Sequence, residues 1–368
     1  MKILHAVLTQ GFYGSERYCA ELAAAQARGG HDVEVLIQDE WSACAHEMRK
    51  AVGSANPVGA GTMRLSSMPS WAPTFLHRMC AQRVIKRFKP DVVHTHLNPA
   101  ARRVGREASK LGIPHVATLH IAYDAREHGD CDGLVCIADW QRGTLENFSG
   151  EVAVVHNWLP DTVADTIMNT TKDQVDSLRQ SWQANHETFV FGSVGRLTVE
   201  KGMDRLVQAF RAAFPRGNEP ARLVIVGDGP EREALEQLAA GDSRIFIAGA
   251  QEKIAIYYLT FDAFAGTARF EPFGLAILEA MAAGCPLVLV RSEGPSEFVT
   301  DKHVKWSEQD DDATLAVNLV TTMAAGWHRL KYDLKNFSHE RATVEIEALY
   351  RHVITRRRAA GAGALAAE

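Results

Sequence analysis

The segment TFVFGSVGRLTVEKG (residues 188–202) joins a short apolar run to a glycine-containing turn with two cations. Apolar runs without polar alternation are typical of strands that are buried on both faces of a parallel sheet. This run predicts a strand that ends near Arg196, and Lys201-Gly202 opens a helical pattern that begins near Met203. Because open parallel sheets bind ligands at the carboxyl ends of their strands, the two cations lie where a ligand is expected.

The same order of strand, turn and helix repeats on both sides of this segment. Downstream, further strands are predicted at RLVIVGDG, RIFIAGA, DAFAGTA and PLVLVR, with helices beginning near Pro230 and Gly274. Upstream, strands are predicted at KILHAVL, DVEVLIQ, DVVHTH, HVATLH, GLVCIA and VAVVHNW, and helical patterns such as SERYCAELAAAQARGG lie between them. This alternation predicts an α/β fold with doubly wound, mostly parallel sheets.

The length favours two domains, because 368 residues exceed what one hydrophobic core usually holds and roughly 150 residues per domain is typical. We predict an N-terminal domain at residues 1–160 and a C-terminal domain at residues 161–336. An amphipathic helical pattern at 337–356 is expected to return to the first domain, and residues 357–368 are expected to form a flexible tail. Two facing sheets predict a binding site in the cleft between them.

The composition is that of a soluble globular protein, with 46% hydrophobic residues, 23% charged residues and a net charge of -5. The six cysteines are scattered without metal-ligand spacing, which predicts a reducing compartment and no zinc site. We see neither a signal peptide nor an apolar run of about 18 residues that could span a membrane. A cytoplasmic location is therefore expected.

Residues 64–110 form a basic stretch, with ten lysines and arginines against two acids. The stretch also contains large apolar residues, which are Met68, Trp71, Phe75, Leu76 and Met79. Two interpretations stay open. The stretch is either a solvated amphipathic helix packed on a sheet, or a surface that binds an anionic membrane. The second interpretation predicts a peripheral protein at the inner face of the cell membrane.

Arg196 and Lys201 are five positions apart, which allows them to approach one anion from two sides. Gly195 and Gly202 permit close approach of the backbone to a ligand. The planar fork of an arginine and the compact charge of a lysine both suit a diphosphate. The alternative is that both cations are solvated on a surface turn.

The segment EPFGLAILEAMAAGCP (residues 271–286) predicts a second anion site. A helix is expected to begin after Gly274, and the free N–H groups of Gly274 and Leu275 suit a phosphate. Glu271 precedes this helix and is expected to project into the cleft, whereas Glu279 lies more than one turn inside it. The alternative is a helix cap followed by a buried glutamate that has a partner.

Six motifs resemble those of the retaining GT-B glycosyltransferases of family 4, and the resemblance covers nearly the whole chain. They are GFYGSERYCAELA, DVVHTHLN, GRLTVEKG, VGDGPE, EPFGLAILEAMAAGCP and GPSEFV. The resemblance implies two Rossmann-like domains that face each other across a cleft. It also implies metal-independent transfer of a hexose-type sugar from a nucleotide-diphosphate sugar to a glycan or lipid-linked acceptor, as in lipopolysaccharide or other cell-envelope polysaccharide synthesis.

The expected donor is a UDP-sugar, with GDP- and ADP-sugars as alternatives, and neither a cofactor nor a nucleic acid partner is expected. The family pattern implies that Arg196 and Lys201 hold the donor diphosphate. Its catalytic residues are Glu271, on the hydroxyls of the transferred sugar, and His120, on the sugar or its acceptor. The donor-binding residues are Gly14, Arg196, Lys201, Phe273, Gly274, Leu275 and Glu279, the last of these on the ribose.

Of the two histidines in HTH (residues 94–96), His96 is expected to line the floor of the cleft. The sequence departs from the family pattern at Tyr13, Ala138 and Trp158, which all lie on the acceptor side. Residues that bind the acceptor are not identified.

Four other functions are alternatives to glycosyl transfer. A nucleotide-sugar epimerase or a glycoside phosphorylase can have the same architecture. A dinucleotide-dependent oxidoreductase is disfavoured because GDGPER lacks the third glycine of the nucleotide-binding fingerprint. A non-catalytic sensor of sugar nucleotides is disfavoured because Glu271 and His120 are both present.

Overall fold

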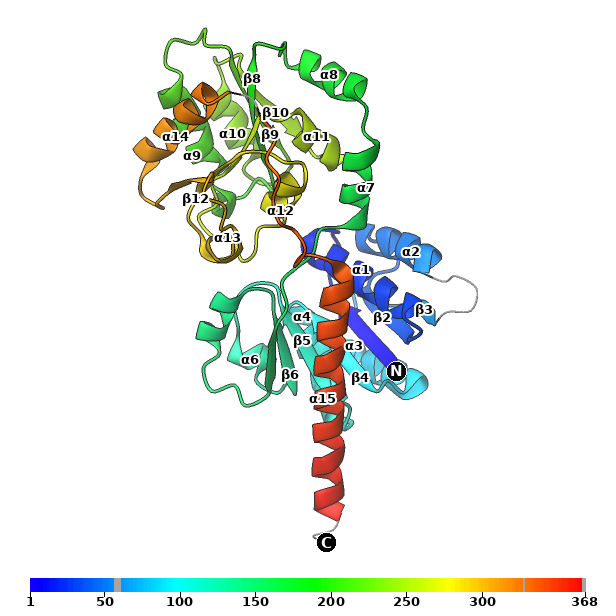
Figure 1. Ribbon diagram of the computed structural model, residues 1–368. Helices are drawn as coiled ribbons and strands as arrows, with labels where there is room; N and C mark the ends of the chain where they lie inside the picture. Colours follow the sequence, from blue (N-terminus) through cyan, green and yellow to red (C-terminus); the bar gives the residue numbers. More distant parts are fainter. Residues whose placement is uncertain (56–60, 327, 366–368) are drawn as a thin grey trace. The chain divides into compact units, whose positions relative to one another are not determined.

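The computed structural model describes residues 1–55, 61–326 and 328–365. Contacts divide the chain into two compact units. Unit 1 comprises Met1–Trp158 and Asn336–Glu368, and unit 2 comprises Leu159–Lys335. Each unit is built on one parallel sheet with helices packed against it (Figure 1), which confirms the predicted α/β class.

The sheet of unit 1 has seven parallel strands in the order β3-β2-β1-β4-β5-β6-β7. Their bounds are β1 (Lys2–Val7), β2 (Asp32–Gln38), β3 (Thr62–Met68), β4 (Val92–His96), β5 (His115–Leu119), β6 (Gly133–Cys136) and β7 (Glu151–Val154). The strand order changes direction between β1 and β4, and the carboxyl ends beside such a switch point are where doubly wound sheets bind ligands.

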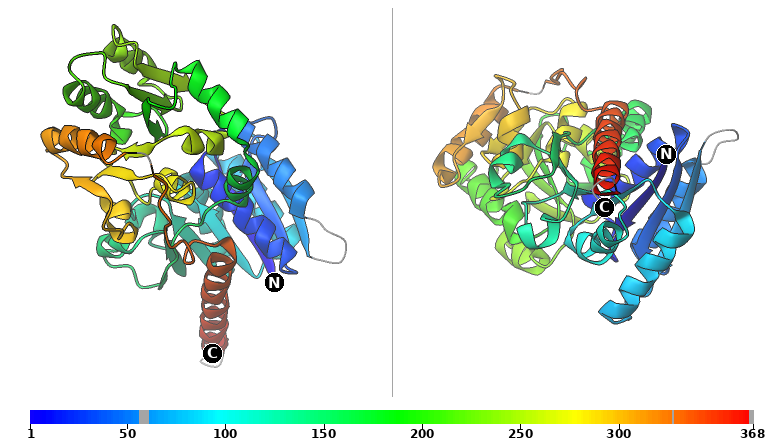
Figure 2. Two further views of the ribbon diagram at one scale, coloured as in Figure 1. Left: turned by 45° about the horizontal axis from the view of Figure 1, so that its top comes forward. Right: turned by 90° about the horizontal axis from the view of Figure 1, so that it is seen from below.

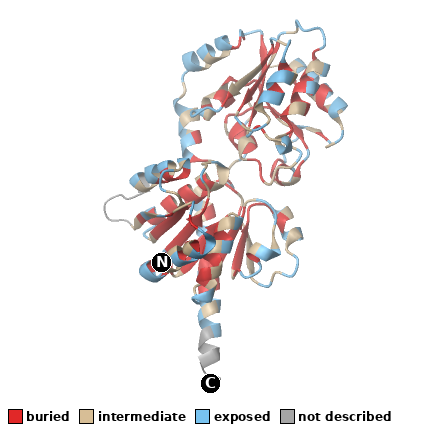
Figure 3. Cartoon of the chain, turned by 180° about the vertical axis from the view of Figure 1, so that it is seen from behind, coloured by how far each residue is buried: buried red, intermediate tan, exposed pale blue. Residues whose placement is uncertain are grey.

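The helices of unit 1 are α1 (Gly14–Arg28), α2 (Ala43–Ala55), α3 (Thr74–Phe88), α4 (Asn98–Ala100), the π-helix η1 (Ala101–Gly105), α5 (Arg106–Lys110), α6 (Ala125–His128), the 3₁₀ helix η2 (Asp139–Thr144) and α15 (His339–Leu365). On one face of the sheet, Leu4, Ala6 and Val93 pack against apolar side chains of α3 and η1. Strands β1, β2, β4, β5 and β6 are buried along most of their length (Figure 3), as their apolar sequences predict, whereas β3 and β7 are only partly buried.

The sheet of unit 2 has six parallel strands in the order β10-β9-β8-β11-β12-β13. Their bounds are β8 (Phe189–Val194), β9 (Ala221–Val226), β10 (Ile245–Gly249), β11 (Ala263–Gly266), β12 (Leu287–Val290) and β13 (Lys305–Ser307). The helices are α7 (Asp161–Asn169), α8 (Lys172–Ser181), the 3₁₀ helix η3 (Val199–Lys201), α9 (Met203–Ala213), α10 (Arg232–Ala239), α11 (Ile254–Thr260), α12 (Leu275–Ala282), α13 (Glu293–Phe298) and α14 (Asp312–Ala324).

The last long helix, α15, belongs to unit 1 and packs against α1, β6 and β7. Figure 2 shows α15 beside the strands of this unit. Arg341 donates to the backbone oxygen of His156 at 2.7 Å, and Arg357 forms an ion pair with Asp132 at 2.9 Å. The predicted tail begins at residue 357, and α15 continues through its alanine-rich part to Leu365.

No helix within the described residues combines the length and the apolar character needed to cross a bilayer.

Candidate active site

The candidate donor site lies at the carboxyl ends of β8 and β11, which are adjacent parallel strands of unit 2. The loops that follow these two strands are hydrogen-bonded to each other. The N–H groups of Arg269 and Phe270 donate to the backbone oxygen of Glu200 at 2.7 and 3.3 Å. The hydroxyl of Thr267 donates to the backbone oxygen of Gly202 at 2.9 Å. The two predicted motifs, GRLTVEKG and EPFGLAILEAM, are therefore parts of one local structure.

Gly202 permits this contact between the loops. Its φ of +63° lies in the left-handed region, which glycine adopts without steric cost. A Cβ atom at this position would lie 2.1 Å from the backbone oxygen of Thr267, closer than any real contact. A side chain here would push the loops apart.

Lys201 and Glu271 form an ion pair, with Nζ of the lysine 2.5 Å from a carboxylate oxygen of the glutamate. Seventy positions separate them in the sequence, and the pairing of β8 with β11 brings them together. Their side chains are 27% and 16% exposed, so a ligand can reach the pair. The carboxylate before the buried helix thus has a cationic partner, as the cost of desolvating an unpaired charge requires.

The backbone of Glu271 is held by residues of the loop before α13 and of α13 itself. Its N–H donates to Oγ of Ser292 at 2.7 Å, and its oxygen accepts from the N–H of Gly294 at 3.0 Å. A Cβ atom on Gly294 would lie 2.4 Å from Cα of Phe273, so glycine is required for this approach. The sequence indicated no role for Ser292, although the neighbouring GPSEFV motif marks the region.

The amino end of α12 lies beside this ion pair. Gly274 caps the helix with a φ of +107°, and the first N–H groups of any helix have no carbonyl partner within it. The N–H of Ile277 already donates to the oxygen of Gly274 at 3.0 Å, so the orphan donors belong to the residues before Ile277, which include Leu275. An anion near Leu275 would be stabilised by these donors and by the helix dipole.

Two of the predicted donor-binding side chains are buried. The ring of Phe273 is 2% exposed and stacks on Phe298 with ring centres 4.8 Å apart, so the ring is not accessible to a ligand. Glu279 is 3% exposed and accepts a hydrogen bond from the hydroxyl of Tyr258 at 2.7 Å. The two glutamates of this segment therefore differ, since Glu271 is accessible and Glu279 lies within the unit.

Arg196 is exposed and lies two positions after the end of β8. The pKa of the Glu200 carboxyl is lowered mainly by hydrogen bonds from its own N–H and from the hydroxyl of Thr198, with smaller contributions from the charges of Arg196 and Lys201. Both predicted cations therefore lie close to one carboxylate, within a single short loop.

In unit 1, His120 directly follows β5 and is half-buried. Its Nε2 is 3.3 Å from Nδ1 of His96, and the edge of the Tyr18 ring packs against it with centres 5.1 Å apart. Burial lowers the pKa of His120 to about 3, so its imidazole is neutral at pH 7. Gly14 is the first residue of α1, the helix that presents Tyr18 to His120.

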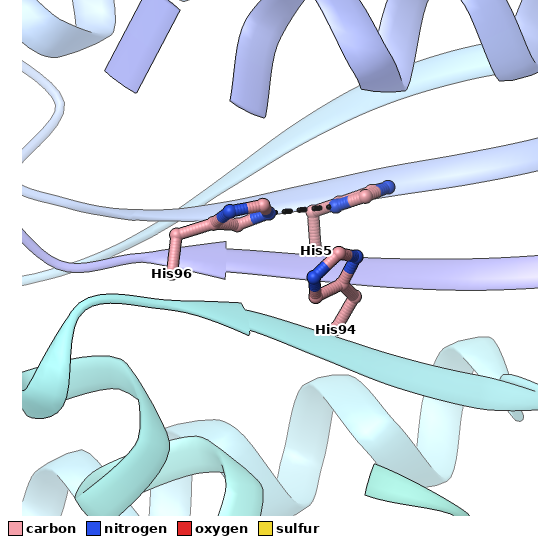
Figure 4. Close-up of side chains that lie close together, drawn as sticks. All are labelled: His5, His94 and His96. Carbon is pink, nitrogen blue, oxygen red and sulfur yellow. Dashed lines mark hydrogen bonds between the residues drawn. The ribbon is translucent and has the colours of Figure 1, made fainter. Parts of the chain in front are cut away.

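Figure 4 shows three histidines that are fully buried in unit 1, His5, His94 and His96. Of these, His96 contacts His120. Among the described residues, His5, His94 and His96 are the group whose ring nitrogens approach one another within 4.8 Å, and three histidines can hold a zinc ion. Here, however, hydrogen bonds occupy the rings. His5 contacts His96 at 3.1 Å, and His94 contacts Thr118 at 2.7 Å. The three histidines thus have hydrogen-bond partners within the protein without a metal ion.

His96 is predicted to line the floor of a cleft, but its side chain is 0% exposed. It contacts His120, which is the more exposed of the two residues. It lies within strand β4, where both faces of the sheet are covered. The partners of the network from α1 and α15, Gln26 and Tyr350, were not predicted. Neither residue lies in a recognisable motif, and they are separated by 324 positions.

Trp158, one of the departures from the family pattern, is buried in unit 1. Its indole N–H donates to Glu21 at 2.6 Å, and its ring lies 4.4 Å from that of Tyr18. Because Tyr18 also contacts His120, this tryptophan supports the surroundings of the histidine through packing. Ala138 is likewise buried.

Two surface hollows of unit 2 lie away from these groups. One of about 490 Å³ is lined by residues 236–247, and one of about 590 Å³ is lined by residues of α8 and α11. Neither is lined by a residue of the candidate site.

Comparison with known proteins identifies the family. Residues 13–192 match the glycosyl transferase 4-like domain, and residues 174–333 match the glycosyl transferases group 1. The chain is 27% identical to the lipopolysaccharide core biosynthesis glycosyltransferase LpsD of Rhizobium meliloti, over 82% of this chain and 81% of the relative. It is 36% identical to a GDP-mannose-dependent alpha-mannosyltransferase of Corynebacterium glutamicum, over 59% of this chain and 55% of the relative.

The structure is similar to that of HepE from Anabaena in complex with UDP and glucose. The TM-score is 0.72 with 17% sequence identity, and the match covers 100% of both chains. At this identity the similarity concerns the fold. Together with the two family models and the local structure of the candidate site, it shows that this chain belongs to the GT-B glycosyltransferases of family 4.

Proposed function

We propose that this protein is a retaining hexosyltransferase that takes its sugar from a nucleotide-diphosphate sugar. The observation on which the proposal rests is the Lys201–Glu271 ion pair beside the amino end of α12. A diphosphate needs positive charge and N–H donors, and a sugar needs a carboxylate that accepts from its hydroxyls. These groups occur together here, with Arg196 close by.

The mechanism follows from where charge develops. The bond between the anomeric carbon and the diphosphate oxygen breaks, and the nucleoside diphosphate leaves with the electron pair. Lys201, Arg196 and the N–H groups at the start of α12 stabilise this leaving group, and one such donor is worth about 2.7 to 4 kcal/mol in comparable sites. The acceptor hydroxyl attacks the face that the diphosphate leaves, and its proton passes to a phosphate oxygen.

In this mechanism fixed cations do the work that a divalent metal ion does in other transferases. We therefore expect full activity in EDTA. An activity that is lost in EDTA and restored by Mn²⁺ would contradict the proposal.

A panel of nucleotide sugars tests the donor. We expect a UDP-sugar to raise the melting temperature of the full chain, with GDP- and ADP-sugars as the competing candidates, because the relatives include proteins described with UDP and with GDP-mannose. A matched Lys201→Ala variant should lose the shift. No shift with any of the three donor classes would contradict the proposal.

A nucleotide-sugar epimerase or a glycoside phosphorylase would use the same donor groups. An epimerase releases an altered sugar nucleotide without any acceptor, and a phosphorylase needs inorganic phosphate. Incubation of the best-binding sugar nucleotide with and without an acceptor glycan separates these outcomes.

We further propose that the acceptor is a glycan or a lipid-linked saccharide of the cell envelope, reached from the inner face of the membrane. The relative LpsD is described as acting in lipopolysaccharide core biosynthesis. The basic stretch supplies a suitable surface, which we call the α3 surface. Its apolar members are Trp71, Phe75 and Met79, spaced four residues apart and 80%, 61% and 60% exposed.

Helix α3 also carries exposed cations. They are Arg78, Arg83, Lys86 and Arg87. Two of them have acidic partners, since Arg87 pairs with Glu34 and Arg78 lies 3.9 Å from Glu107. Aromatic residues within a cationic surface suit the headgroup region of an anionic membrane.

Co-sedimentation with vesicles of anionic lipid at low salt tests the α3 surface. We expect the wild-type protein to bind, and a Trp71→Ser/Phe75→Ser variant to bind much less. Val344→Ser is the matched control, because Val344 is also a 64% exposed apolar residue of unit 1 but lies on α15. Equal binding by all three proteins, or none by the wild type, would exclude the α3 surface.

A further inference from the structure

A chain of hydrogen bonds connects Gln26 in α1 to His120 at the edge of the sheet. Oε1 of Gln26 is 2.7 Å from Nε2 of His5, and Nδ1 of His5 is 3.1 Å from Nε2 of His96. Nδ1 of His96 is in turn 3.3 Å from Nε2 of His120. Gln26, His5 and His96 are all 0% exposed, so the chain is shielded from solvent up to His120.

The chemistry of these groups sets the direction of every hydrogen bond. The amide oxygen of Gln26 can only accept, so Nε2 of His5 must hold the shared proton. Burial lowers the pKa of His5 to about 4, so the ring is neutral at pH 7 and its Nδ1 is a bare acceptor. The N–H at Nε2 of His96 must then donate to His5.

The same reasoning extends to the end of the chain. Burial also lowers the pKa of His96 well below its ordinary value, so this ring holds one proton and its Nδ1 accepts from Nε2 of His120. His120 is neutral as well, since its pKa is lowered to about 3. Its proton is on Nε2, and no described residue forms a hydrogen bond with its Nδ1. Nδ1 of His120 is therefore a free acceptor at the edge of the sheet.

Tyr350 of α15 fixes the orientation of Gln26. The amide nitrogen of Gln26 donates to the hydroxyl oxygen of Tyr350 at 3.5 Å, and that hydroxyl is hydrogen-bonded to Nδ1 of His94. The other nitrogen of His94 contacts the hydroxyl of Thr118 at 2.7 Å. The amide nitrogen of Gln26 can only donate, so the hydroxyl oxygen of Tyr350 accepts from it. The amide oxygen then faces His5.

We propose that Gln26 and Tyr350 are positioning residues that set the tautomer of His120, so that its Nδ1 accepts a hydrogen bond from a hydroxyl of the sugar substrate. This inference rests on the proposed function. A bare ring nitrogen attracts an O–H group and repels a phosphate oxygen, which also only accepts. His120 thus serves a hydroxyl, while the phosphates belong to the cations of unit 2.

The test is ¹⁵N NMR of the full chain labelled at histidine, at pH 7 and without substrate. The ¹⁵N shifts distinguish a protonated ring nitrogen from a bare one, and the His120→Gln variant assigns the signals of His120. We expect the tautomer with the proton on Nε2 in the wild type, and a mixture of both tautomers in Gln26→Leu and in Tyr350→Phe. Tyr350→Phe keeps the packing of the ring, so it preserves the test if Gln26→Leu does not fold.

His115 is the internal control. It is also buried and neutral, but its contacts are with Thr95 and Cys131, which are not part of the hydrogen-bonded series from Gln26 to His120. Its NMR signals should therefore not change in either variant. A proton on Nδ1 of His120 in the wild type, or an unchanged His120 in both folded variants, would overturn the proposal. In glycosyl transfer assays both variants should lower kcat by roughly 2- to 10-fold, the worth of one weakened hydrogen bond.

Because the NMR measurement needs no substrate, the two proposals can fail separately. The expected tautomers together with an absence of glycosyl transfer would reject the proposed function and keep the chain of hydrogen bonds. Glycosyl transfer by a wild type with the opposite tautomer would reject only the positioning role.

Discussion

Lys201 and Glu271 show how charged side chains can lie beside a buried sheet without a large cost in folding free energy. Each has an opposite charge within 2.5 Å, and both keep contact with solvent. The buried Glu279 instead accepts a hydrogen bond from the hydroxyl of Tyr258. At the scale of residues, the types and positions of the charged groups could be predicted from local motifs. Their partners Tyr258 and Ser292 could not, because the sheet brings them from distant parts of the sequence.

Replacement of Lys201 by alanine should lower kcat by roughly 10² to 10³ fold, because a fixed cation that stabilises the leaving group is lost. The fold should persist, since a partly exposed ion pair contributes only about 0 to 1 kcal/mol. Steady-state kinetics and thermal unfolding measure the two effects. Lys302→Ala, at an exposed lysine of the same unit, is the matched control. Normal turnover in Lys201→Ala would be incompatible with the proposed role.

Glu271→Ala should abolish most of the activity and leave the protein folded. The carboxylate is proposed to hold sugar hydroxyls, whereas the backbone contacts with Ser292 and Gly294 do not depend on the side chain. Activity and melting temperature should be measured on the same preparation. A lower melting temperature with unchanged kcat would mean that Glu271 only stabilises the loop.

At the scale of elements, the strands of both sheets were predictable because burial on both faces gives unbroken apolar runs. The edge strands β3 and β13 were missed. An edge strand is covered less completely, and TMRLSSM in β3 mixes apolar with polar residues. The polar segment after residue 160 forms α7 and α8, for which the sequence analysis predicted no helices. The capping box of Thr171 and Gln174 was its local signal.

The contact between the loops after β8 and β11 can be tested at Gly202. Gly202→Ala combines an unfavourable positive φ with a clash against the backbone of Thr267, so unit 2 should lose roughly 1 to 3 kcal/mol of unfolding free energy and most of its donor binding. Gly217→Ala is the matched control, because its φ is +78° but no atom lies within 4 Å of its Cβ position. Chemical denaturation and donor titration measure both effects. Equal losses in the two variants would show that the contact between the loops is unimportant.

At the scale of the whole molecule, the histidine network is the feature that the sequence did not reveal. It joins residues of α1, β1, β4, β5 and α15, and each contact depends on the completed topology. The family motifs identified His120 but not the groups beneath it. Polar residues within apolar strands, such as His5 in KILHAVL, were the available signal.

These buried histidines should make the fold sensitive to acid. Burial lowers the pKa of His5 to about 4 and that of His115 and His120 to about 3, and it lowers those of His94 and His96 well below 6.5. Below pH 6.5 the unfolded chain therefore binds more protons than the folded chain. The unfolding free energy should be highest above pH 6.5 and should fall on acidification, by up to about 1.4 kcal/mol per pH unit for each group.

Thermal unfolding between pH 8 and pH 5 measures this dependence. His5→Gln should flatten it, whereas His46→Gln, at an exposed histidine of unit 1, should not. A melting temperature that is constant over this range would exclude the predicted cost of protonation.

The contribution of α15 to unit 1 affects the order in which the chain can fold during its synthesis. Residues 159–335 contain every strand of unit 2, so this unit can be completed as soon as they leave the ribosome. The first 158 residues emerge earlier but lack Tyr350 and the helix that packs on β6 and β7 until residues 339–365 have been synthesised. Unit 1 can thus mature only after unit 2 has been made, and a stop codon before residue 339 would leave β6 and β7 without this helix and His94 without its tyrosine partner.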